Sequence, residues 1–190
     1  MEEPSVDLSK LKKLLGGLRE VFPRTSGKNY EVGVLLAFVQ EVLNNPEFKE
    51  TAIAGKMLLL IISSIKEASP YLFANPTEIV SSITAGDTSI DEAVGELLSL
   101  IKDNVSSDLV PAKNLLWFMK QALSGERGSD FYASLGDAVS LIHTWMCKAE
   151  ASAELLATAQ EAAQLAEMLQ VVVPQPPSIV PSSTPDDPGY

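Results

Sequence analysis

Apolar side chains recur at intervals of three and four residues along almost the whole chain, and this spacing limits the possible folds more than any other feature. Residues spaced in this way share one face of an α-helix, whereas a half-buried strand needs strict alternation, and no sustained alternation occurs. Pro23, Ser69–Pro70 and Gly125 each end an apolar segment. The sequence therefore predicts an all-α fold, a bundle of six to seven helices.

Turn-forming residues and helix caps set the expected helix boundaries. Asn45–Pro46 offers an N-cap followed by proline at the first helical position, and Ser89-x-x-Glu92 fits a capping box. The helices are expected at about 7–22, 30–44, 45–68, 76–84, 89–105 and 108–125, and from 129 onward. The third of these has only a thin polar stripe, so we expect its segment from Phe48 to Ile65 to be the buried central helix of the bundle.

The last helical segment is unusually long. No proline and no glycine pair interrupts the chain from Ser129 to Pro174, and a helix of that length would measure roughly 60 Å. It must therefore bend near Ala149–Ser152, or its far half, residues 150–170, must project from the bundle. That far half has a seam of small and leucine residues with the spacing of a short coiled coil: Leu155, Ala159, Ala162, Ala166 and Leu169. We expect this seam to contact a partner helix or a second copy of the chain.

The expected domain organisation is one all-α domain, residues 1–170, followed by a disordered proline-rich tail, residues 171–190. The tail has no basic residue and no pattern of core positions. Its prolines are Pro174, Pro176, Pro177, Pro181, Pro185 and Pro188.

Composition excludes several classes of protein. The chain has 25 acidic and 14 basic side chains and a net charge of −11, which disfavours general nucleic-acid binding. One cysteine cannot form an internal disulfide, and one cysteine with one histidine cannot provide a Cys/His zinc site. The charge is also uneven, because residues 149–190 contain six acidic residues and no basic one, whereas the N-terminal segment is locally basic. This asymmetry suggests head-to-tail contact between copies of the chain. The alternative is that the acidic residues only keep the protein soluble.

No pattern indicates a catalytic residue, a cofactor or a metal ion. His143 and Cys147 share one helical face, but neighbours on a continuous helix lack the separate groups that nucleophilic catalysis requires, so we interpret them as a boundary histidine and a packed cysteine. The pairs Trp117–Phe118 and Trp145–Met146 could line an apolar pocket, but helical spacing favours the core. The acidic side chains could supply a carboxylate pair for acid–base catalysis, but we interpret them as solvent-exposed residues on helix faces.

The sequence also predicts the compartment. The longest apolar run, Met57–Ile62, is too short for a bilayer span. The acidic N-terminus does not resemble a secretory signal, so we expect an intracellular, cytoplasmic protein, although a fragment of a longer precursor would look the same. Lys10, Lys12, Lys13 and Arg19 make the first helix basic as well as leucine-striped.

These features support one leading hypothesis and one alternative. The leading hypothesis is a non-enzymatic protein-interaction or assembly protein, a structural or adaptor component of a larger complex, such as a viral one, whose partner is a protein or a second copy. The alternative is a helical bundle that binds an apolar ligand, or a membrane surface through its basic first helix.

Overall fold

α-Helices account for most of the residues that the computed structural model of the chain describes, which are 5–22, 29–45, 47–48, 51–72, 81–82, 85–104 and 106–172. Within these ranges there is no strand, so the predicted all-α class is confirmed. The helices are α1 (Ser5–Val21), α2 (Tyr30–Asn44), α3 (Ala52–Ala68), α5 (Ile90–Ile101), α6 (Val110–Ser124), α7 (Ser129–Lys148) and α8 (Ala153–Val172), with short 3-10 turns at Pro70–Leu72 and Ser107–Leu109. The helix predicted at 76–84 lies outside the described residues except for 81–82.

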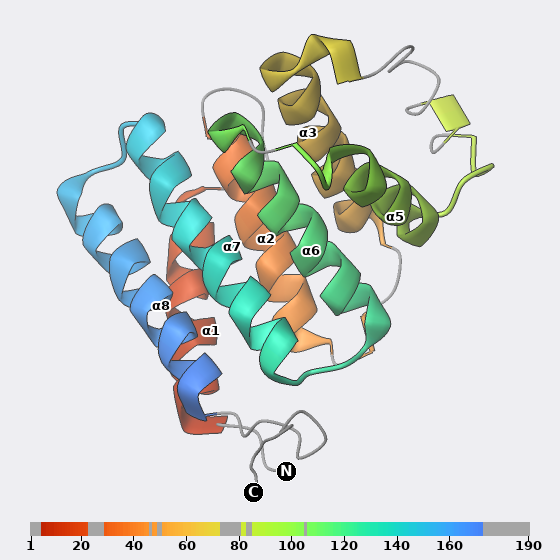
Figure 1. Cartoon of the computed structure of the whole chain (residues 1–190). Helices are drawn as coiled ribbons and strands as arrows, with labels where there is room; N and C mark the ends of the chain where they lie inside the picture. The colour runs from red at the N-terminus through yellow and green to blue at the C-terminus, as the bar shows by residue number, and fades with distance from the viewer. Residues whose placement is uncertain are drawn as a thin grey trace, which may run out of the picture.

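The helices pack in two layers (Figure 1). One layer consists of α8, α7, α6 and α5 side by side, and the other consists of α1, α2 and α3. Between the layers α1 contacts α8, α2 contacts α7, and α3 contacts both α6 and α5. As a result α8 and α5 form the two opposite edges of the longer layer.

A row of aromatic rings joins the layers in the core. Phe38 of α2 meets Phe48 and Phe118 edge to face, each with ring centroids 5.6 Å apart. Phe118 of α6 lies 5.8 Å from Phe131 of α7, which in turn meets Tyr132 at 5.1 Å. Such pairs contribute about 0.5–1.5 kcal/mol each beyond their area burial. The row therefore links α2, α6 and α7 where the layers meet.

The central helix is α2 and not the segment from Phe48 to Ile65. Every residue from Val32 to Val39 is buried, because α2 lies between α1 and α3 and is covered by α7. Helix α3 has an open side, on which Lys56, Leu59 and Ser63 are exposed. Helix α3 also begins later than predicted, because Thr51 is extended and its Oγ1 accepts a hydrogen bond from the amide of Ala54 at 3.4 Å.

Two other boundaries follow their sequence signals. Ser89 caps α5 through a complete capping box: its Oγ accepts from the amide of Glu92 and its own amide donates to Glu92 Oε1, both at 3.1 Å. Helix α6 ends at Gly125, whose φ of 80° is the left-handed conformation that glycine adopts without strain.

The long C-terminal segment bends rather than projects. Helix α7 ends at Lys148 and α8 begins at Ala153, with Glu150 between them at a φ of 61°. The chain thereby reverses, and α8 packs back against α7 and α1 (Figure 1). Residues 150–170 are thus part of the bundle. Helix α8 includes Val171 and Val172 of the predicted tail, and residues 173–190 lie outside the described residues.

Candidate functional site

The predicted seam of α8 lies inside the bundle. Its alanines and Leu169 have no exposed surface and Leu155 is partly buried, because this side of α8 faces α1 and α7. The approach is close: a Cβ placed on Gly136 of α7 would lie 3.8 Å from Cγ of Glu167. The small residues therefore serve helix–helix contact within the chain, and in this fold the seam offers no free surface to a second molecule.

The opposite side of α8 is exposed in the part of the chain that the structure describes. Its exposed residues recur at intervals of three and four, and we call them the α8 outer face: Glu154, Ala157, Glu161, Gln164 and Met168. Met168 leaves 52% of its surface exposed. Helix α8 has no basic residue, and the pKa of the neighbouring Asp137 is raised by burial and by the charge of Glu167. Among the described residues, this edge of the molecule is therefore acidic, and Met168 is its large exposed apolar side chain.

The basic first helix is part of the bundle. Leu8, Leu11, Leu15 and Leu18 are buried, so its apolar side already has partners. Lys10 Nζ lies 3.2 Å from Glu161 Oε2, and Arg19 Nη1 donates to Gln40 Oε1 at 3.0 Å. Insertion of the leucine side of α1 into a membrane surface would require α1 to leave the bundle. None of the described helices combines the length and apolar character needed to cross a bilayer.

Among the described residues, no side-chain hydrogen bond or ion pair joins His143 and Cys147 to each other or to a third group. Cys147 is exposed, so the prediction of a packed cysteine is wrong, and His143 is partly exposed as predicted. In the described part of the chain no group of three histidine, cysteine or acidic residues is arranged to hold a metal ion.

The two tryptophans differ from their neighbours. Phe118 and Met146 are fully buried, as predicted for core positions. Trp117 leaves 39% of its surface exposed, and Trp145 is only partly buried. The prediction of a core position is therefore wrong for Trp117 and only partly right for Trp145.

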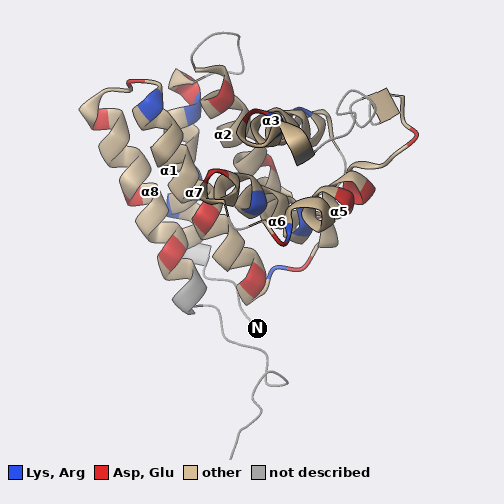
Figure 2. Ribbon diagram, turned by 45° about the horizontal axis from the view of Figure 1, so that its top comes forward, with Lys and Arg blue, Asp and Glu red and all other residues tan. Residues whose placement is uncertain are grey.

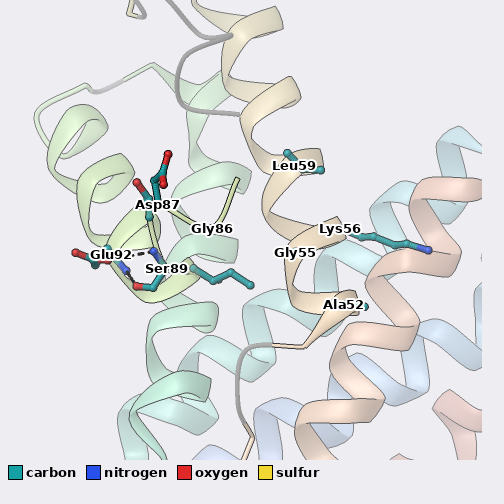
Figure 3. A pocket seen from close by; sticks show the side chains of 10 residues that line it. Ala52, Gly55, Lys56, Leu59, Gly86, Asp87, Ser89 and Glu92 are labelled. Atoms are coloured by element: carbon teal, nitrogen blue, oxygen red, sulfur yellow. Dashed lines mark hydrogen bonds between the residues drawn. The ribbon is translucent and has the colours of Figure 1, made fainter. Parts of the chain in front are cut away.

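One hollow, of about 620 Å³, lies between α3 and the loop before α5 (Figure 3). Figure 3 shows Gly55 and Leu59 of α3 facing the loop at Gly86, whereas the side chain of Lys56 points away from α5. Its charged lining residues are of both signs, Lys56 on one side and Asp87 with Glu92 on the other. The lining therefore does not select a ligand by charge.

Two further hollows adjoin Trp145, at the end of the bundle where α7 ends. They share Ser64, Glu67, Trp145 and Lys148, and their volumes are about 360 and 520 Å³. Polar surface predominates in both, and acidic residues from three other segments surround them: Glu31, Asp108 and Glu150. Among the described residues that line these two hollows, no polar side chain is both buried and without an interaction partner. Neither hollow therefore indicates a ligand.

The hollow between α5 and α6, about 400 Å³, has a distinct chemistry. Its apolar centre consists of Leu98 of α5 and Trp117 of α6, beside Gly95, whose missing side chain leaves open space. We call it the α5–α6 groove, and its remaining lining residues are Ser99, Lys102, Lys113, Asn114 and Lys120.

The three lysines of the groove make it basic. Lys120 Nζ lies 5.3 Å from the centre of the Trp117 ring, a cation–π distance, and Lys113 donates to the carbonyl of Asn104. Helix α6 has no acidic residue, and neither Lys102 nor Lys120 forms an ion pair with the described residues. Figure 2 shows basic positions where α5 and α6 meet, with acidic positions elsewhere on α5, and acidic positions along α8.

Comparison of the chain with protein-family models, with curated proteins and with solved structures gave no match. The α5–α6 groove is therefore a candidate site on the basis of its geometry and chemistry alone. Sequence reasoning missed it, although one signal was present: Lys113, Trp117 and Lys120 recur at helical spacing on one face of α6.

Proposed function

We propose that this chain acts by binding another protein rather than by catalysing a reaction, and that the α5–α6 groove is its binding surface. The observation that most supports this proposal is the exposed Trp117 between lysines, in a chain whose net charge is −11. Tryptophan is enriched among the residues that dominate binding energy at interfaces. Such a protein would serve as an adaptor or structural component of a complex.

The chemistry of the groove defines the partner. Lys102 and Lys120, which form no ion pair with the described residues, attract an acidic segment and orient it, while Leu98, Trp117 and the open space beside Gly95 accept an apolar side chain. A groove about 400 Å³ in volume fits one or two side chains of a helix rather than a whole domain. The preferred partner is therefore an acidic helix with an exposed apolar residue.

We place this binding in the cytoplasm. The thiol of Cys147 is free and exposed, and such thiols persist in reducing compartments.

Site-specific photocrosslinking tests the proposed function. A photoreactive residue replaces Ser99 in the groove or, as a control, the exposed Ser63 of α3, in cells that express the chain. We expect a discrete crosslinked protein from position 99 that is absent from position 63 and is lost when Lys102 and Lys120 are changed to glutamate. The absence of an adduct at position 99, or the same adducts at both positions, would contradict the proposal.

A further inference from the structure

We propose that the α5–α6 groove of one copy receives the α8 outer face of a second copy, so that identical chains associate head to tail. This inference rests on the proposed function, because it names the protein that the groove binds. It requires two complementary surfaces on one chain that cannot reach each other within that chain.

The two surfaces are complementary in charge. The charged residues that line the groove are all lysines, Lys102, Lys113 and Lys120, whereas the charged residues of the α8 outer face are Glu154 and Glu161. The net charge of −11 opposes association at long range, but charges more than about 8 Å apart are largely screened at physiological ionic strength. Contacts of a few ångströms between lysine and glutamate therefore determine whether the two surfaces attract.

The surfaces also match in their apolar parts. Met168 is the exposed apolar residue of the α8 outer face, and Trp117 is the exposed apolar residue of the groove. Methionine adapts its shape to irregular hollows and packs well against aromatic rings.

The existing ion pair of Glu161 does not prevent this contact. Lys10 and Glu161 are both about half exposed, at 56% and 49%. Exposed pairs of this kind contribute only about 0–1 kcal/mol, so Glu161 can exchange Lys10 for a lysine of the second copy at little cost.

The position of the surfaces determines the symmetry. Helices α8 and α5 form opposite edges of the same layer, so one copy cannot bring its own α8 outer face to its own groove (Figure 1). A second copy that docks α8 in the groove therefore packs across α5 and α6. The contact is heterologous, which means that every added copy leaves one groove and one outer face open for further growth or ring closure.

Sedimentation equilibrium of the purified full chain tests this inference. We expect the weight-average mass to rise above 20.4 kDa with concentration. A groove variant, Lys102→Glu with Lys120→Glu, and a face variant, Met168→Asp, should each stay at the monomer mass. An equimolar mixture of the two should form dimers and nothing larger, since only one intact groove and one intact face remain per pair.

A matched control separates groove chemistry from net charge. Lys56→Glu with Lys66→Glu makes the same charge change at exposed positions of α3, and it should associate like the unmodified chain. Circular dichroism verifies that each variant keeps its helices.

Loss of association in the control variant, or no rescue in the mixture, would overturn the head-to-tail contact. A purified chain that stays monomeric at every concentration would overturn it too, while an adduct of position 99 with a different protein would leave the proposed function standing.

Discussion

Two adjacent glycines in α1 differ in what surrounds them. A Cβ on Gly17 would meet nothing within 4 Å, whereas a Cβ on Gly16 would lie 3.3 Å from Nε2 of Gln40. The amide of Gln40 is held in place, because its Oε1 accepts the hydrogen bond from Arg19 at 3.0 Å. Gly16 therefore permits the close packing of α1 on α2, and Gly17 has no comparable role.

This difference predicts the effect of alanine at each position. Alanine is favoured over glycine in a helix interior by about 1 kcal/mol, so Gly17→Ala should raise the free energy of unfolding by about that amount. Gly16→Ala should gain less or lose stability, because its methyl group crowds Gln40. Urea denaturation of both variants measures the difference. An equal gain in both would show that Gln40 moves aside freely.

At the scale of the helices, local signals predicted boundaries well where a single cap was present. The box of Ser89 and Glu92 begins α5 as expected, and Gly125 ends α6. The start of α3 was predicted at Asn45–Pro46, but the helix begins after Thr51, a cap that the prediction did not include. Periodicity does not decide between two caps a few residues apart, since both are followed by apolar residues.

The capping box gives a prediction for α5. Ser89→Ala removes the oxygen that accepts from the amide of Glu92, so stability should fall by about 1 kcal/mol. Hydrogen bonds from Ser89 lower the pKa of Glu92 below its usual value of 4.5. The contribution of the Glu92 carboxylate is therefore present above pH 4.5 and lost as the pH falls through the lowered pKa.

Thermal unfolding at neutral and acid pH measures both effects. The Glu92→Gln variant should be less stable than the unmodified chain at neutral pH and equal to it once Glu92 is protonated. A constant difference across the pH range would contradict a role for the carboxylate charge.

At the scale of the whole molecule, the sequence predicted which residues are buried better than which neighbours bury them. The apolar stripe of 48–65 correctly indicated a helix with several neighbours, but α2 is the enclosed helix because the layer order places α1, α3 and α7 around it. The α8 seam likewise predicted close helix packing, but the expected partner was another molecule, whereas the structure packs the seam against α1 and α7 of the same chain. The groove was missed for the same reason, since it exists only where α5 and α6 lie side by side.

The internal position of the seam leads to a prediction about the whole bundle. Ala162 is fully buried where α8 meets the rest of the chain, and Ala157 lies on the outer face of the same helix. Ala162→Leu should lower the free energy of unfolding by about 1–3 kcal/mol, because a larger side chain forces α8 away from its neighbours. Ala157→Leu should change it by less than about 0.5 kcal/mol. Urea denaturation at low protein concentration compares the two variants. If the seam instead faced a second copy, Ala162→Leu would alter association and leave the stability of the monomer unchanged.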